Sequence, residues 1–214
     1  MSSSNPVFDY RTLRLLMGLI ALLLPFIVYF VSKDPDLPSI SFSYYTDSRD
    51  MFVGMLFIVG SFLFAYNGHY DSQSKLSKAA AIAAILVAIF PTSCAGCPSS
   101  IVSYIHFISA ITLFSILAYF CFVIFRIKTK GQPGKKGRRS KIYLTCGLIM
   151  VACMLVMLIS FKLLTPEELD HSRIIFFGEG IALIAFGVAW IVSGKSFKFV
   201  ADEEEIFHPF KKPG

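Results

Sequence analysis

Apolar residues along the chain fall into six long runs separated by short polar segments. The runs cover approximately residues 12–31, 51–66, 77–91, 100–125, 142–163 and 173–193. A helix needs about 20 apolar residues to cross the hydrocarbon core of a bilayer, within a range of roughly 17–25. The second and third runs reach this length only with their flanking residues. The pattern predicts an all-α, polytopic membrane protein, with a six-transmembrane-helix bundle within residues 1–195 and a cytoplasmic tail over residues 196–214.

The distribution of basic residues predicts the orientation of this bundle. Lysine and arginine concentrate in the cytoplasmic loops of membrane proteins. Lys75 lies in the loop before the third run and Lys78 near the start of that run, whereas the loops before the second and sixth runs are mainly acidic. The loop between the fourth and fifth runs holds eight basic residues and no acidic one: Arg126, Lys128, Lys130, Lys135, Lys136, Arg138, Arg139 and Lys141. We therefore expect both termini and this basic loop to lie in the cytoplasm.

Composition and net charge narrow the class of protein. Hydrophobic residues make up 55% of the chain and charged residues 16%, against about 25% charged in soluble domains. The first run is long and no small-residue cleavage site follows it, so we expect a retained helix rather than a signal peptide. The net charge of +6 is concentrated in the basic loop. That favours anionic lipid headgroups as the partner of Arg126 to Lys141 rather than nucleic acid. The plasma or inner membrane is the expected location.

The basic loop also contains glycine and proline residues, which predict a flexible, solvated segment. The tail that follows the sixth run alternates aromatic and charged residues and ends its acidic stretch at Glu205. We expect this tail either to lie along the membrane surface or to be disordered.

Two ionisable residues inside the apolar runs have the same expected depth. His106 and Glu179 each follow the outer start of a run by about six residues, which is about 9 Å at 1.5 Å per residue. A single ionisable group in hydrocarbon is unfavourable, so we expect these two to form a hydrogen-bonded pair. Arg49 and Asp50 begin the second run on the same side, and Tyr44 and Tyr45, just before it, suit the interface.

These residues suggest a polar pocket that opens to the outer leaflet and binds a membrane lipid or a small amphiphile without chemistry. Arg49 is the expected headgroup anchor, with Tyr44 or Tyr45 at the rim. Two other interpretations stay open. The His106–Glu179 pair could serve only to join helices, or His106 could be the general base of an intramembrane lipid-modifying hydrolase or transferase.

Two of the five cysteines form a Cys-X-X-Cys sequence in the third loop, which is outside in this topology. An oxidising compartment favours a disulfide between Cys94 and Cys97. A thiol redox centre is the alternative, since this spacing lowers the thiol pKa, although no other cysteine lies outside to shuttle electrons. No metal-ligand set, phosphate-binding glycine loop or hydrolase motif occurs. The sequence therefore predicts no metal and no cofactor, and it identifies no reaction.

Three short segments resemble a known superfamily. They are Ser39-Ile40-Ser41 before the second run, Ile105-His106-Phe107-Ile108-Ser109-Ala110 in the fourth, and Gly178-Glu179-Gly180 in the sixth. Their order is similar to that in the six-helix superfamily of the autophagy modulator DRAM, the FRAG-type proteins of GPI-anchor remodelling and the yeast SFK-type proteins.

The resemblance implies a role in membrane lipid handling or organisation and names no reaction. It matches His106 and Glu179 to the positions typical of the superfamily, and Ser39 and Ser41 more weakly. Residues 44–54 depart from the superfamily's usual sequence and look more like those of uncharacterised bacterial relatives.

Overall fold

The computed structural model describes residues 10–68, 71–94 and 100–207, and every regular element in these ranges is helical. The all-α prediction is therefore confirmed. Short turns accompany the helices: the 3₁₀ helices η1 (Ser41–Tyr45) and η3 (Glu203–Glu205), and the π-helix η2 (Phe120–Ile124). The α-helices are α1 (Tyr10–Ser32), α2 (Arg49–Ala65), α3 (Asp71–Ile89), α4 (Ile101–Tyr119), α5 (Gly134–Leu163), α6 (Pro166–Ser172) and α7 (Ile174–Gly194).

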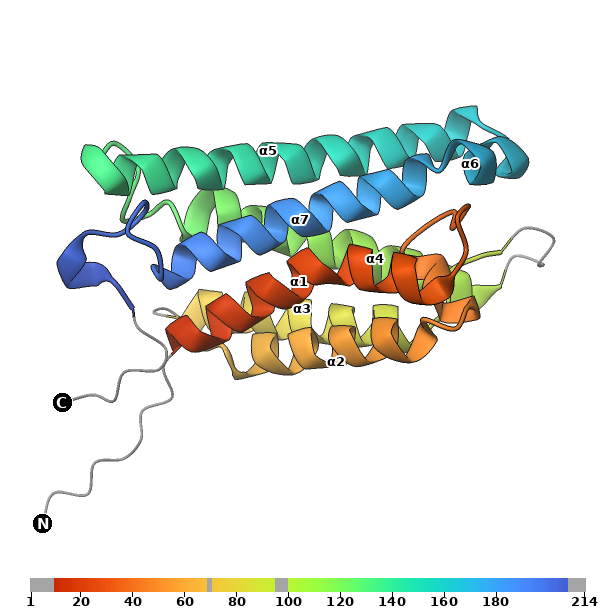
Figure 1. Ribbon diagram of the computed structural model, residues 1–214, viewed down its shortest axis with the longest axis horizontal. Helices are drawn as coiled ribbons and strands as arrows, with labels where there is room; N and C mark the ends of the chain where they lie inside the picture. Colours follow the sequence, from red (N-terminus) through yellow and green to blue (C-terminus); the bar gives the residue numbers. More distant parts are fainter. Residues whose placement is uncertain (1–9, 69–70, 95–99, 208–214) are drawn as a thin grey trace, which may run out of the picture.

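The long helices run side by side along one axis of an elongated bundle (Figure 1). α7 packs between α1 and α5, and α3 packs between α2 and α4. Five segments are long and apolar enough to cross a membrane: α1, α3, α4 together with η2, α5, and α7. α2 is shorter, at 17 residues. Five such helices in one bundle indicate an integral, multi-pass membrane protein.

Two glycines bring the backbones of α1 and α7 together. A Cβ atom added to Gly187 would lie 2.7 Å from the backbone oxygen of Gly18, and one added to Gly18 would lie 2.7 Å from the backbone oxygen of Gly187. Small residues allow this approach, which membrane helices use to gain packing contacts where no hydrophobic driving force exists. Neighbouring side chains on both helices, Met17 and Ala189 among them, are completely buried.

An aromatic cluster around Trp190 fills the core beside this contact. The Trp190 ring centre lies 4.8 Å from that of Phe125, 5.3 Å from that of Phe120 and 5.0 Å from that of Phe186. The wide turn of η2, closed by a 2.9 Å hydrogen bond from the Phe125 N–H to the Phe120 carbonyl, brings both of these phenylalanines to the same indole. The π-helix therefore has a packing role at the end of α4.

Some helix limits differ from those expected from hydropathy. α3 begins at Asp71 rather than near residue 77, and α5 begins at Gly134 rather than near residue 142. A hydropathy pattern marks only the apolar part of a helix. Both helices begin earlier, with polar turns that precede their apolar runs. The basic loop, expected to be flexible throughout, is therefore helical from Gly134.

α6 lies in a segment that was expected to be a loop. The Thr165 hydroxyl accepts a hydrogen bond from the Glu168 N–H at 3.3 Å, and the Glu168 carboxylate accepts one from the Thr165 N–H at 2.8 Å. This reciprocal capping box, with Pro166 at the first helical position, is a recognised start signal. The sequence carries it, and hydropathy alone misses it.

Gly187→Ala should destabilise the bundle, because the added methyl group meets the backbone of α1 rather than a flexible side chain. We expect a loss of roughly 1–3 kcal/mol, as for other overpacked sites, measured as a lower thermal unfolding temperature in a fixed detergent. Gly54→Ala on α2 is the control, since a Cβ atom there has nothing within 4 Å. Equal unfolding temperatures for the two variants would contradict the close α1–α7 contact.

Candidate functional site

The residues predicted to form a pocket gather around η1, in the segment that joins α1 to α2. This end of the bundle, which we call the η1 end, lies opposite the end where α1 and α5 begin and where residues 195–207 lie (Figure 1). We call the latter the tail end. The two ends hold different sets of polar contacts.

Glu179 on α7 anchors η1. The Ser41 hydroxyl donates to one Glu179 carboxyl oxygen at 2.8 Å, and the Ser41 N–H donates to the other at 3.1 Å. Ser39 shapes the same turn, because its hydroxyl oxygen accepts a hydrogen bond from the Phe42 N–H at 2.9 Å. The loop between α1 and α2 is thereby attached to α7 through a carboxyl group in the bundle.

His106 joins α4 to the end of α3. Its Nδ1 atom lies 2.7 Å from the carbonyl oxygen of Phe90, and the residue is only 4% exposed. A carbonyl oxygen can only accept, so Nδ1 carries the proton in this contact. Phe90 directly follows α3, and the last carbonyls of a helix have no partner within the helix. His106 therefore provides a donor where the backbone lacks one.

The prediction of a hydrogen bond between His106 and Glu179 is wrong. Glu179 accepts its hydrogen bonds from Ser41, whereas His106 donates to the Phe90 carbonyl. The expectation matched the two residues by depth, and equal depth does not make two helices neighbours. α4 packs mainly against α3 and α5, while α7 packs mainly against α1 and α5.

An open cavity of about 430 Å³ lies between η1, α2 and α3. Its volume falls within the roughly 300–1,000 Å³ of small-molecule sites. Polar groups come from η1 and the first turn of α2, and the remaining lining is apolar. The lining residues are Tyr44, Arg49, Asp50, Val53, Gly54, Ala88 and Ile89. The structure thus brings three of the predicted site residues to one cavity, while His106, Glu179, Ser39 and Ser41 do not line it.

Arg49 and Asp50 present opposite charges at this cavity. Arg49 Nη2 donates to the Tyr44 hydroxyl at 2.9 Å, and its guanidinium carbon lies 4.3 Å from the centre of the Tyr44 ring. Among the residues that the structure describes, neither Arg49 nor Asp50 forms an ion pair. Both charges can therefore receive a ligand.

Tyr45 connects η1 to the segment that follows α3. Its hydroxyl donates to the Thr92 carbonyl, in the segment after α3, at 2.7 Å. Partial burial, with Tyr44 beside it as the smaller cause, raises the pKa of Tyr45. Tyr45 is therefore a structural contact of η1 rather than part of the cavity lining.

The cysteines divide into bonded and free groups. Cys94 is disulfide-bonded, and Cys97 lies outside the described residues, so the pairing of these two stays a prediction. Cys121, Cys146 and Cys153 are free thiols, and the first two are buried. Burial is the typical state of a cysteine that serves as a packing residue.

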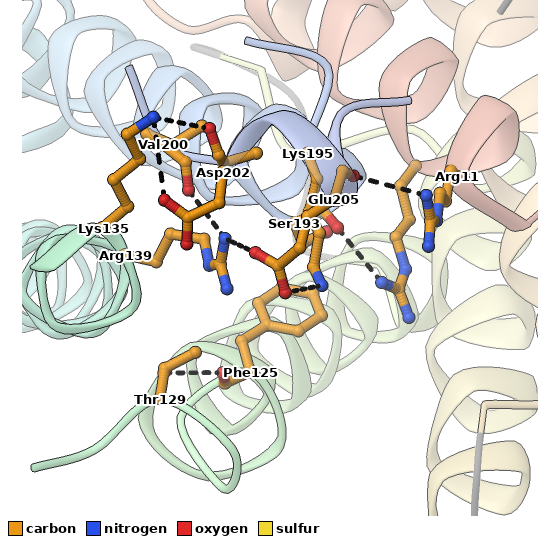
Figure 2. Close-up of polar contacts among 12 residues, drawn as sticks. Arg11, Phe125, Thr129, Lys135, Arg139, Ser193, Lys195, Val200, Asp202 and Glu205 are labelled. Atoms are coloured by element: carbon orange, nitrogen blue, oxygen red, sulfur yellow. Dashed lines mark hydrogen bonds and ion pairs between the residues drawn. The ribbon is translucent and has the colours of Figure 1, made fainter. Parts of the chain in front are cut away.

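A second polar cluster lies at the tail end and was not predicted from the sequence. The Glu205 carboxylate bridges two cations, with Arg139 Nη1 at 2.8 Å and Lys195 Nζ at 2.9 Å (Figure 2). The hydrogen bond from Arg139 is the main cause, and that from Lys195 a smaller one, of the lowering of the Glu205 pKa to about 2. Because this pKa lies below its ordinary value of 4.5, the contribution of the bridge to stability is complete above that pH and is lost as pH falls towards 2.

Basic side chains of α5 hold the rest of the tail through its backbone. Arg139 is only 2% exposed and also donates to the Val200 carbonyl at 2.7 Å. Lys135 donates to the Ala201 carbonyl at 3.0 Å and lies 3.7 Å from the Asp202 carboxylate (Figure 2). The four acidic residues at 202–205, set against the eight basic residues of the loop, are the sequence signal that indicates this contact.

Comparison of the chain with protein-family models, with curated proteins and with solved structures finds no match.

Ser41→Ala and Ser43→Ala should have different effects, although both serines are buried in η1. Ser41→Ala removes a hydrogen bond to Glu179, and we expect a loss of about 1–3 kcal/mol in unfolding free energy. The Ser43 hydroxyl has no hydrogen-bond partner in the described part of the chain, so Ser43→Ala should be neutral or stabilising. Thermal unfolding of both variants checks this. A loss of stability in Ser43→Ala as large as in Ser41→Ala would refute the anchoring role of Glu179.

Proposed function

We propose that this chain crosses the membrane six times, with both termini in the cytoplasm, and binds a phospholipid or similar amphiphile of the outer leaflet. The cavity between η1, α2 and α3 is the proposed site. The observation that carries the proposal is the combination of apolar walls with two opposite charges that lack ion-pair partners among the described residues.

The number of crossings depends on whether α2 spans the membrane. Its 17 residues give a length of about 25 Å at 1.5 Å per residue, close to the roughly 30 Å of the hydrocarbon core. It packs against α1 and α3, both of which are long and apolar enough to cross. A helix of this length between two spans supports a sixth crossing, and the basic residues near the tail end support a cytoplasmic location for that end.

The lining chemistry suits an amphiphile. The Arg49 guanidinium presents planar donors that fit phosphate, and the Asp50 carboxylate can accept from an ammonium group. Val53, Gly54 and Ile89 form the apolar part of the wall, next to which an acyl chain can lie. The resemblance to a superfamily of lipid-handling membrane proteins agrees with this assignment.

Binding is better supported than catalysis. A general base must reach the group whose proton it removes. In the described ranges no hydroxyl, thiol or carboxyl group hydrogen-bonds to His106, which contacts a backbone carbonyl instead. A hydrolase or transferase centred on His106, and a thiol redox role for Cys94 and Cys97, are therefore secondary proposals.

Filling the cavity should remove the ligand. Gly54→Leu places a side chain where a Cβ atom has nothing within 4 Å, so it should fill the cavity without disturbing the fold. We expect native mass spectrometry with lipid extraction to show loss of the phospholipid that copurifies with the unaltered protein. Leu155→Phe, at an exposed position of α5, which does not line the cavity, is the control and should retain it.

Removing one charge tests the headgroup contact in the same assay. Arg49→Gln should weaken retention of the phospholipid, whereas Lys33→Gln, an exposed position outside the cavity lining, should not. An unchanged lipid profile in folded Gly54→Leu and Arg49→Gln would refute the proposed site.

A further inference from the structure

The tail end contains an anion site that a segment of the chain itself occupies. The Glu205 carboxylate lies between Arg139 and Lys195, and the Asp202 carboxylate lies by Lys135 (Figure 2). Arg139 is almost fully buried, which is unusual for an arginine and requires an anionic partner. The side chains that hold the acidic segment Asp202–Glu205 are therefore positioned and paired as a binding site for negative charge.

The surface around this site carries a surplus of positive charge. Five basic side chains between residues 126 and 141 are exposed and lack an ion pair within the described ranges: Lys128, Lys130, Lys136, Arg138 and Lys141. In the orientation proposed above, this surface faces the anionic lipids of the cytoplasmic leaflet. Basic clusters beside membrane helices attract such headgroups.

Several of the hydrogen bonds that hold the tail come from the cations that would bind a headgroup. The carbonyls of Phe199, Val200 and Ala201 accept hydrogen bonds from Arg138, Arg139 and Lys135 respectively. An anion that occupied these cations would therefore compete with the backbone contacts of the tail as well as with its carboxylates.

Two aromatic residues of the tail are available for the membrane. Phe197 and Phe199 are 52% and 64% exposed, although large aromatic side chains prefer burial or the membrane interface. A tail released from α5 could insert these rings among lipid headgroups.

We propose that Arg139, Lys195 and Lys135 form a binding site for the clustered phosphates of a polyanionic lipid headgroup, and that Asp202–Glu205 occupies this site until such a lipid displaces it. Phosphate can replace carboxylate here because both accept the parallel donors of a guanidinium group. The buried arginine has an anionic partner both before and after the exchange. The proposal uses the orientation given above but does not depend on the outer cavity.

The test is hydrogen–deuterium exchange of the full chain in phosphatidylcholine nanodiscs. Adding phosphatidylinositol bisphosphate should raise deuterium uptake in the peptide that covers residues 197–207, because the Phe207 N–H to Lys195 carbonyl bond and the neighbouring turns open. Phosphatidylserine at equal net surface charge should raise it much less. Both leaflets of a nanodisc present the lipid, so the result is independent of orientation.

Variants of the acidic segment separate displacement from general charge attraction. Glu205→Gln removes the internal competitor, and we expect it to strengthen binding of the bisphosphate lipid on the order of tenfold, equivalent to one charge-assisted contact. Glu203→Gln is the matched control, since it makes the same change of charge at an exposed residue without an ion pair in the described ranges. It should bind as the unaltered protein does.

Other outcomes are also decisive. If Glu205→Gln and Glu203→Gln raised the affinity for the lipid equally, the binding would reflect general charge attraction, and the proposed site would be wrong. Deuterium uptake of residues 197–207 that the lipid leaves unchanged would also overturn the proposal. Release of the tail by the soluble bisphosphate headgroup would support the phosphate site and assign its ligand to a free phosphate ester. Release only by the intact lipid would support the membrane as its source. Gly54→Leu should respond as the unaltered protein, which keeps this test separate from that of the outer cavity.

Discussion

The backbone contact between α1 and α7 at Gly18 and Gly187 is the constraint on which both polar ends of the molecule depend. α7 carries Glu179, which anchors η1 at one end, and it leads into Lys195, which pairs with Glu205 at the other. α1 contributes Arg11, whose Nη1 lies 3.4 Å from the Glu205 carbonyl. A shift of these two helices against each other would therefore move the attachment points of both ends together.

The two ends satisfy their polar groups in different ways. At the η1 end, side-chain donors meet carbonyl and carboxyl groups: Ser41 with Glu179, His106 with Phe90, and Tyr45 with Thr92. Within the described ranges, Arg49 and Asp50 at the cavity form no ion pair. At the tail end, cations and carboxylates pair directly, with Arg139 buried at the centre. Arg49 and Asp50 are thus exposed at one end, whereas Glu205 pairs with Arg139 and Lys195 at the other.

The sequence predicts the helices well because lipid requires long apolar runs, and it predicts helix neighbours poorly. Depth along a helix follows from residue spacing, so His106 and Glu179 could be assigned equal depth, but their partners depend on how the helices pack. Tyr44, Arg49 and Asp50 line one cavity, and their closeness in sequence made that grouping easy to anticipate. The contact between Arg139 and Glu205 joins residues far apart in the chain. The only sequence signal for this contact is the opposite charge of the two segments, which a hydropathy pattern does not show.

In the arrangement proposed for this chain, the η1 end lies outside and α2 is a full crossing. Asp47 and Asn67 are exposed residues on either side of α2, so their accessibility tests both points directly. Single-cysteine variants Asp47→Cys and Asn67→Cys would be treated with a membrane-impermeant maleimide on intact cells, in a background whose native cysteines do not react. We predict labelling at 47 from outside and labelling at 67 only after permeabilisation. Labelling of both positions from the same side would contradict the six-crossing arrangement.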